Sequence, residues 1–314
     1  MGNPLALEQF ARLADRRLDD VMEGYLRPYQ EMIGELFGTM PLDKAFAELF
    51  DIGSMPDIPP FTGKLDFLDI APGYYTRIEP KEYAGGIQVQ KKFIEDKQFG
   101  VLDDLQGGLL KSYGRTKEKS AVRAFGYAFS TSWDFMTNEE AVSLCSASHL
   151  TKSGAITSLG FSNYGTSLAD KAAVNATRIL FKKFRDDIGE LYESEPDAIL
   201  CPEALYDTFL EITGYDPRSG ATSDLDPTTA QHRVNTLYKG LKVIPWRRLD
   251  DYSTTAWFMV DTVMMKKMLK WIDRIKPETA TQADFHTFTV MQSLRGRFGW
   301  GWRNWRWIYG HRPS

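Results

Sequence analysis

The sequence predicts an α+β fold in which an extended arm and a strand-rich segment precede a larger body. Apolar residues recur at helical spacing near the N-terminus and again over 98–128. Alternation at strand period begins after residue 61, and short apolar runs separated by turn residues fill the second half. The presence of both periods indicates a protein that mixes helices with sheets, and no internal repeat accompanies them.

The composition is that of an ordinary folded chain. Of the 314 residues, 43% are hydrophobic and 25% are charged. The net charge of −4 argues against a protein that coats nucleic acid by bulk attraction. Cys145 and Cys201 lie in no metal-binding or disulfide pattern, so a reduced compartment is expected. The longest apolar run, 256–260, is far too short for a membrane span, and no signal peptide is evident.

Residues 1–60 are predicted to form an acidic, amphipathic arm. A helix start at Asn3-Pro4 leads into apolar residues at helical spacing: Leu7, Phe10, Ala11, Ala14, Leu18, Val21 and Tyr25. The arm carries eleven acidic and five basic residues. Because it would bury little apolar surface alone, we expect its stripe to contact a partner surface. Packing on its own domain is the alternative.

Residues 61–97 are predicted to form a long hairpin. Tyr75, Arg77 and Glu79 alternate with their neighbours before a turn or hinge at 80–86, and the alternation resumes over 87–93. Such a hairpin is marginally stable alone and needs a surface to lie against. A helix follows over 98–128, where Gly107, Gly108 and Gly114 indicate close packing or a bend.

The second half alternates helices and strands. A capping box at Ser167 and Asp170 predicts a helix to about residue 187. A buried strand over 197–201 precedes a helix that Pro202 opens and Gly214 closes. A long polar loop at 214–230, strands at 241–244 and 256–260, and a helix at 263–274 complete this part.

The C-terminal segment interleaves arginine with aromatic residues and contains no acid after Asp284. Such a segment is typical either of a groove for single-stranded nucleic acid or of packed strands. In a strand, the aromatic residues of 298–302 would share one face because they stand at even positions. Those of 305–309 would also share one face, but they stand at odd positions. We therefore predict packed strands: a hairpin at 303–304 that pairs Trp302 with Trp305, Trp300 with Trp307 and Phe298 with Tyr309. A single strand with a bulge is the alternative. Arg303 and Arg306 are candidates for subunit contacts or a DNA-facing surface.

No catalytic, cofactor-binding or metal site is predicted. The chain lacks a phosphate-binding loop, HExxH and GxSxG. The spacing of the four histidines does not match that of metal ligands; they are His149, His232, His286 and His311. An enzyme with an unrecognised site remains only as an alternative.

Several segments together resemble the major capsid proteins of tailed bacteriophages, which have the Hong Kong 97-type fold. The resemblance rests on the order of elements and on local matches at 144–149, 167–187, 197–205, 240–246, 257–261 and the closing aromatic segment. It implies an N-terminal arm (1–60), an E-loop hairpin (61–97), a spine helix with a peripheral domain (98–164), an axial domain (165–285) and closing strands that return to the peripheral domain (286–314).

The resemblance also implies a function. Proteins of this family self-assemble as pentamers and hexamers into an icosahedral head that encloses double-stranded DNA, and they are not enzymes. The expected partners are the chain itself, a portal protein, a separate scaffolding or decoration protein, and DNA held by weak, non-specific contacts, with no membrane. The expected location is the virion, after assembly in the cytoplasm of the bacterial host.

Candidate inter-subunit contacts follow from this interpretation. They are Phe10, Leu18, Tyr25, Tyr75, Tyr83, Lys91 and Lys92. Two alternatives remain open: an encapsulin-like shell around a cargo enzyme, and a nucleic-acid-binding protein that uses the Arg/Trp segment.

Overall fold

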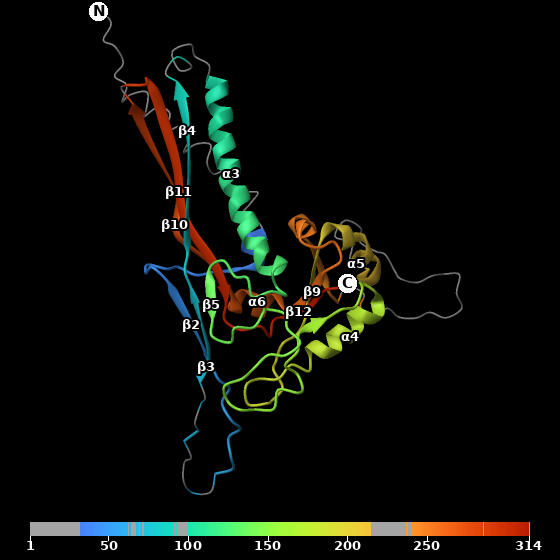
Figure 1. Ribbon diagram of the computed structural model, residues 1–314. Coiled ribbons are helices and arrows are strands. Elements are labelled where there is room, and N and C mark those ends of the chain that lie inside the picture. Colours follow the sequence, from blue (N-terminus) through green and yellow to red (C-terminus); the bar gives the residue numbers. More distant parts are fainter. Residues whose placement is uncertain are drawn as a thin grey trace, which may run out of the picture. The chain divides into compact units, whose positions relative to one another are not determined.

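The computed structural model describes residues 32–61, 63, 67–68, 70, 72–90, 92, 99–214, 237, 240–284 and 286–313 (Figure 1). The chain divides into two units. The first draws on Met1–Phe46, Glu79–Ala121 and Trp271–Trp300. The second draws on Ala47–Ile78, Val122–Lys270 and Gly301–Ser314. Each unit therefore combines segments that are far apart in the sequence.

A four-stranded sheet forms the first unit, in the order β1 (Gly38–Thr39), β10 (Leu269–Asp284), β11 (Thr289–Trp302) and β4 (Lys81–Gln90). Strand β11 runs antiparallel to β4, from Thr289 opposite Gln90 to Phe298 opposite Lys81. Helix α3 (Phe99–Gly126) confirms the helix predicted over 98–128. Its Gln106 Nε2 donates to Gln292 Oε1 at 3.0 Å, which ties α3 to β11.

Aromatic rings form the core of the first unit. Phe298 stacks on Tyr83 with ring centroids 4.5 Å apart and on Trp271 at 5.3 Å. Tyr113 of α3 meets Phe298 edge-on, and Phe37 meets Trp271 edge-on. The indole N–H of Trp300 donates to the Ser120 carbonyl oxygen at 2.6 Å. These contacts bury the aromatic face of β11 against α3 and its neighbouring strands.

A five-stranded sheet forms the centre of the second unit. Its order is β6 (Tyr164–Gly165), β12 (Ile308–His311), β9 (Trp257–Val260), β7 (Ala198–Cys201) and β8 (Lys242–Pro245). Every residue of β7, β9 and β12 is buried. Continuous apolar runs such as those of β7 and β9 are what strands covered on both faces require. The strands predicted at 197–201, 241–244 and 256–260 are thus confirmed.

Three α-helices and two 3₁₀ turns accompany this sheet: α4 (Lys171–Phe181), η1 (Glu203–Leu205), α5 (Tyr206–Thr213), η2 (Arg247–Asp251) and α6 (Thr262–Met268). Gly214 ends α5 in the left-handed region at φ 60°, as predicted. The prediction for α4 is partly wrong. Asp170, not Ser167, is its N-cap, with Oδ1 accepting from the Ala173 N–H. The helix ends at Phe181, and Phe184 then packs against that ring.

The three-stranded sheet of the second unit corrects the predicted hairpin at 61–97. Strand β3 (Pro72–Ile78) pairs with β2 (Ala47–Ile52) on one side and with β5 (Met136–Asn138) on the other. Strand β4 belongs to the other sheet, and residues 81–86, predicted as a turn, lie within it. The hairpin of the structure is therefore β2–β3, and its first strand comes from the segment predicted as an arm.

The C-terminal hairpin at 303–304 is also wrong. Strand β11 pairs with β10 and β4, whereas β12 pairs with β9 and β6. Trp302 meets Trp133, Trp305 meets Phe184, and Trp307 meets Phe125 instead of one another. Residues 303–307 are the connection between the two sheets, so the segment 286–314 does not close a single sheet. Nearly all of its aromatic side chains are nonetheless buried, as the packed-strand prediction required.

Within the described residues, no helix is both long enough and apolar enough to cross a membrane.

Candidate functional site

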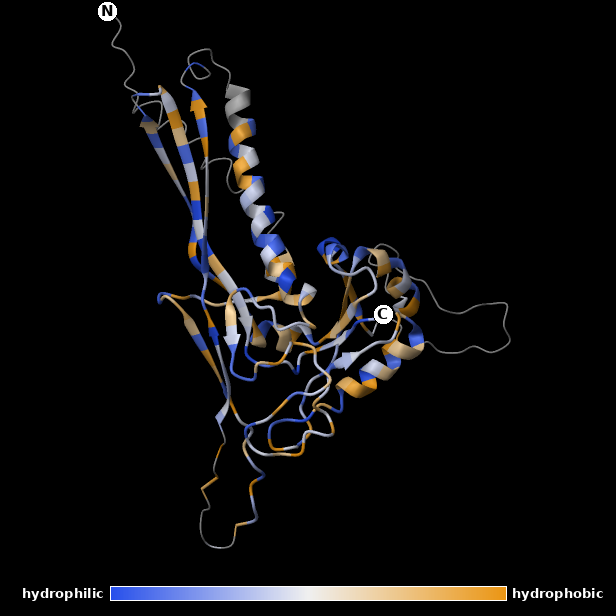
Figure 2. Cartoon of the chain, viewed as in Figure 1, coloured by the Kyte–Doolittle hydropathy of each residue, from blue (hydrophilic) through white to orange (hydrophobic). Residues whose placement is uncertain are grey.

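Exposed apolar side chains lie along the β2–β3 hairpin, which we define as residues 47–78. Figure 2 shows hydrophobic residues along β2 and in the described part of the loop, whereas β3 is largely pale or blue. The side chains concerned are between 37% and 96% exposed: Phe50, Ile52, Met55, Ile58, Phe61, Phe67, Ile70 and Tyr75. Monomeric proteins rarely expose so much contiguous apolar surface. The hairpin therefore has the character of a binding element.

The base of the hairpin is packed, unlike its far end. Ala47 and Ile78 face each other across the two strands and are both buried, and Thr76 is buried as well. Further out, the rings of Phe50 and Tyr75 stack across the strands with centroids 6.1 Å apart. Both of these rings stay exposed. The body of the second unit thus holds the hairpin at one end and leaves the other end open.

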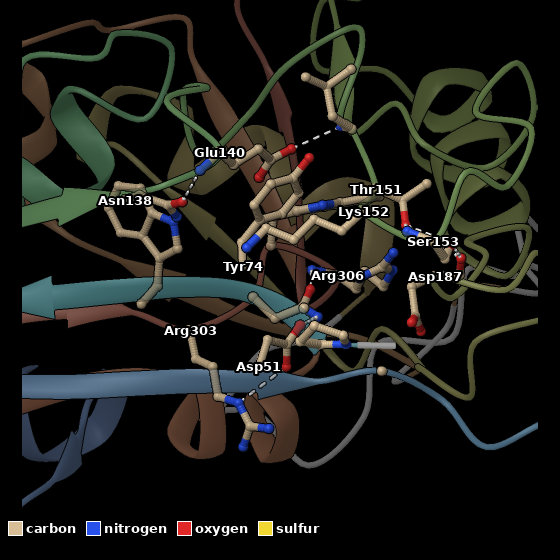
Figure 3. Close-up of a pocket in the computed structure, with 17 residues that line it drawn as sticks. Asp51, Tyr74, Asn138, Glu140, Thr151, Lys152, Ser153, Asp187, Arg303 and Arg306 are labelled. Atoms are coloured by element: carbon tan, nitrogen blue, oxygen red, sulfur yellow. Dashed lines mark hydrogen bonds and ion pairs between the residues drawn. The ribbon is translucent and has the colours of Figure 1, made fainter. Parts of the chain in front are cut away.

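Asp51 fastens the base of the hairpin to the connection between β11 and β12 (Figure 3). Its Oδ1 accepts from Arg303 Nε at 3.1 Å and its Oδ2 from Asn304 Nδ2 at 3.0 Å. Burial raises the pKa of Asp51, and the nearby guanidinium groups of Arg303 and Arg306 oppose that shift. A Cβ on Gly73 would lie 2.8 Å from Asp51 Cβ, so the closeness of the two strands here requires glycine.

Further hydrogen bonds surround this contact and line a polar pocket (Figure 3). Asp187 Oδ1 accepts from the Ser54 N–H at 2.7 Å, just beyond β2. Lys152 Nζ lies 2.5 Å from Glu139 Oε2. Glu140 Oε1 accepts from the Leu150 N–H at 2.9 Å. Each of these carboxylates is already engaged by a donor. These bonds join segments that are far apart in the sequence, as a structural joint does.

Arg306 lies at the back of this pocket and is buried. Its Nε donates to the Arg185 carbonyl oxygen at 2.6 Å, and its guanidinium lies 4.9 Å from the Trp305 ring. The prediction that Arg306 contributes to a DNA-facing or subunit surface is therefore wrong for this chain. An arginine flanked by aromatic rings serves packing here, because those rings cover it from solvent.

The described residues contain no group of three or more His, Cys, Asp or Glu side chains that could hold a metal ion. Burial raises the pKa of Cys145, and it raises that of Cys201 to about 12. Thiols in such surroundings are poor nucleophiles. What the geometry offers is a contact surface.

A model of a family described as phage capsid protein matches residues 74–310. The chain belongs to the phage capsid protein family.

Solved structures share its fold. A chain from Mycobacterium phage Patience aligns with a TM-score of 0.55 and 12% identity, over 96% of this chain and 88% of that one. The Cyanophage Pam1 capsid aligns at 0.53 and 11% identity, over 88% of each chain. The virus-like particle from Pyrococcus furiosus aligns at 0.54 and 8% identity, over 95% and 98%. No curated protein shows significant sequence similarity.

The prediction of a tailed-phage major capsid protein with the Hong Kong 97-type fold is confirmed by the family match and the shared fold. As a phage capsid protein, the chain is a structural subunit of a capsid shell in the virion.

The structure places the predicted contact residues in different surroundings. Tyr75 lies exposed on the hairpin. Tyr83 stacks on Phe298 inside its own unit and is half-buried. Lys92 is exposed. The other four lie outside the described residues: Phe10, Leu18, Tyr25 and Lys91.

Sequence reasoning missed the first strand of the hairpin. Residues 47–52, Ala-Glu-Leu-Phe-Asp-Ile, precede the turn-rich stretch 53–60. Two short runs around such a stretch are a hairpin signal. The helical spacing of Phe46, Leu49 and Phe50 obscured this hairpin signal. Asp51 was missed because its partners, Arg303 and Asn304, lie about 250 residues away.

Proposed function

We propose that this capsid protein assembles as pentamers and hexamers into the icosahedral head of a tailed phage and that this head encloses double-stranded DNA. The exposed apolar hairpin carries the proposal. Its side chains are too exposed in the single chain to stabilise it, and contact with neighbouring copies removes them from water. Many such modest contacts give a shell strong total cohesion.

The parts of the chain take roles accordingly. The β2–β3 hairpin, rather than residues 61–97, acts as the E-loop. The first unit, with most of α3, is the peripheral domain, and the five-stranded sheet of the second unit is the core of the axial domain. A portal protein and a separate scaffolding or decoration protein are the expected partners. Assembly takes place in the host cytoplasm.

Expression of the chain, with and without a scaffolding protein, tests this function by negative-stain electron microscopy. Capsomers or shells are expected from the wild type. A variant that lacks residues 54–70 should fold yet give no stable particles, since it loses most of the exposed apolar side chains. Substituting Val263, exposed on α6, by serine is the matched control. Monomers from every preparation would refute the proposal.

A second shell function shares this fold, because the virus-like particle from Pyrococcus furiosus aligns over nearly its whole length. The contents of purified particles distinguish the two functions. A phage head from infected cells yields nuclease-protected double-stranded DNA and weak, salt-sensitive protein–DNA contacts. A cargo shell yields a second protein in fixed ratio and no protected genome.

A further inference from the structure

His149 is a buried histidine that has an oxygen atom beside each of its ring nitrogens. Its Nδ1 lies 2.9 Å from Glu140 Oε1, and its Nε2 lies 3.0 Å from Asn163 Oδ1. The ring stacks on Trp305 with centroids 4.1 Å apart, and the His149 N–H donates to Phe161 O at 2.8 Å. Ring and backbone are therefore both held in place. We call His149, Glu140 and Asn163 the histidine clasp.

The orientation of the Asn163 side-chain amide is fixed by three other hydrogen bonds. Its Nδ2 donates to Leu144 O at 2.8 Å and to Ile308 O at 3.2 Å. Its Oδ1 accepts from the Ser146 N–H at 2.8 Å. Turning the amide over would place its NH₂ group against the Ser146 N–H and its oxygen against two carbonyl oxygens. The Asn163 atom that faces His149 Nε2 is therefore an acceptor.

Glu140 Oε1 is also an acceptor, because the Leu150 N–H donates to it at 2.9 Å (Figure 3). A neutral imidazole has one N–H, so one ring nitrogen of His149 would turn a lone pair toward an oxygen. A buried contact of that kind costs free energy. An imidazolium donates from both nitrogens. The Glu140 carboxylate, whose side chain is 7% exposed, balances its charge.

We propose that His149 is an imidazolium in the folded subunit at neutral pH and that the histidine clasp loosens when alkaline solution removes its proton. The unfolded chain releases the corresponding proton near pH ~6.5. Because the folded chain binds that proton more strongly, the clasp stabilises the fold fully below this pH, and the stabilisation is lost as the pH rises. The inference concerns the single subunit and does not depend on the proposed function.

The other charged groups near the clasp balance one another. The charged and titratable groups concerned are Asp51, Tyr74, Glu139, Lys152, Asp187, Arg303 and Arg306. Three are acids and three are cations, and burial raises the pKa of the Tyr74 phenol, which stays neutral. Arg306 opposes a second cation nearby, but Asp51 and Asp187 also act on its charge. The carboxylate in direct contact with His149 therefore dominates.

Nitrogen-15 NMR of the histidine rings in the free wild-type subunit at about pH 8 tests the clasp. A doubly protonated ring gives two similar nitrogen shifts, whereas a neutral ring gives two widely separated shifts. Ordinary histidines are neutral at this pH. His311 is neutral as well, since burial lowers its pKa to about 4. One imidazolium pattern is expected among the four histidines, and four neutral rings would overturn the proposal.

Two substitutions of adjacent residues assign the signal. Glu140→Gln keeps the size of the side chain and removes its charge, so the imidazolium pattern should vanish at about pH 8. Glu139→Gln is the matched control, because Glu139 is exposed and pairs with Lys152 instead. That variant should keep the pattern. An imidazolium pattern that persisted in Glu140→Gln would contradict the assignment to His149.

Urea unfolding between about pH 7 and about pH 9 measures the effect on the fold. The urea midpoint of the wild type should fall as the pH rises, and the midpoint of Glu140→Gln should change less. Glu139→Gln should follow the wild type. Parallel profiles of the wild type and Glu140→Gln would show that the clasp is not sensitive to pH.

Discussion

His311 is enclosed by partners that suit only its neutral form. Its ring stacks on Trp257 at 4.1 Å, and its Nδ1 accepts from the Ser167 N–H at 3.2 Å. The proton is therefore assigned to Nε2, which donates to Thr177 Oγ1 at 2.7 Å while that hydroxyl donates to Ala173 O. Burial lowers the pKa of His311 from 6.5 to about 4.

This histidine makes stability depend on pH. Between pH 6.5 and 4 the unfolded chain binds the proton more readily than the folded chain, so stability falls as the pH falls through that window. The full loss is about 3 kcal/mol. Chemical denaturation at several pH values measures it. His311→Asn should flatten this part of the profile, whereas His286→Gln, at an exposed position, should leave it unchanged. If the free energy of unfolding of His311→Asn fell with pH as steeply as that of the wild type, the assignment would be contradicted.

In the first unit, Lys117 is a charged residue that lies buried. Its side chain is 5% exposed, and Nζ lies 2.9 and 3.1 Å from the two carboxylate oxygens of Asp273. The rings of Trp271 and Phe298 flank the ammonium at 5.4 and 5.8 Å. The charge is thus balanced by one carboxylate and two aromatic faces.

Replacing Lys117 by methionine should destabilise the chain by about 3 kcal/mol, because it leaves the carboxylate of Asp273 partly buried without its partner. Urea unfolding measures the loss. Adding Asp273→Leu should recover much of it. Lys182→Met, which breaks an exposed pair with Glu195, should unfold like the wild type. Equal effects of the two lysine substitutions would show that burial does not matter here.

At the scale of elements, one polar contact controls a whole hairpin. The strands β2 and β3 are anchored by the packing of Ala47 and Ile78, and Asp51 adds a fixed point where their register shifts beyond Phe50. Beyond Asp51, the described part of the hairpin carries exposed apolar side chains, and the Ser54 N–H donates to Asp187 Oδ1. The orientation of the hairpin therefore depends mainly on the bonds to Asp51 from Arg303 and Asn304, with Asp187 as a further contact.

Asp51→Ala should loosen the hairpin without unfolding the subunit. Losing two charge-assisted hydrogen bonds costs about 2 kcal/mol locally, so limited proteolysis within 52–71 should accelerate roughly 10-fold or more. Cleavage sites mapped by mass spectrometry check this. Glu48→Ala, on the same strand but exposed, is the control. Unchanged cleavage would mean that packing at the base alone fixes the hairpin.

At the scale of the whole molecule, the chain is incomplete by itself. Its two units have their own cores, while the hairpin leaves apolar side chains in water. Assembly that covers them stabilises the folded state by mass action.

Particles should therefore unfold at a higher temperature than free subunits, and the difference should depend on subunit concentration. Replacing Ile58, Phe61 and Phe67 by serine should leave the melting temperature of the free subunit unchanged, because each is at least 74% exposed. In the same triple variant, the rise in melting temperature that assembly gives the wild type should be absent. Differential scanning fluorimetry of both fractions measures this. A lower melting temperature of the free variant would show that these side chains stabilise the single chain.

Much of the fold follows from local patterns. The apolar periodicity predicted α3 within two residues at each end, and continuous apolar runs predicted β7 and β9. Gly214 marked the end of α5. Local signals suffice in these cases because helix periodicity, burial on both faces and a left-handed cap each depend on neighbouring residues alone.

The pairing of the strands did not follow from local patterns. The alternation in 72–90 is real, yet its two halves belong to different sheets, and the aromatics of 298–309 pack against distant rings instead of one another. Period-2 alternation shows that a residue lies in a strand and which face it occupies. It says nothing about which strand lies alongside, since backbone hydrogen bonds are the same for every partner.

The sequence by itself determined α3, the end of α5, the buried strands and the resemblance to phage capsid proteins, because these depend on local composition and order. Tertiary structure alone decided that β2–β3 is the exposed hairpin, that Asp51 meets Arg303 and that Arg306 is buried. The physical reason is that exposure and ion pairing depend on what long-range folding places beside a side chain.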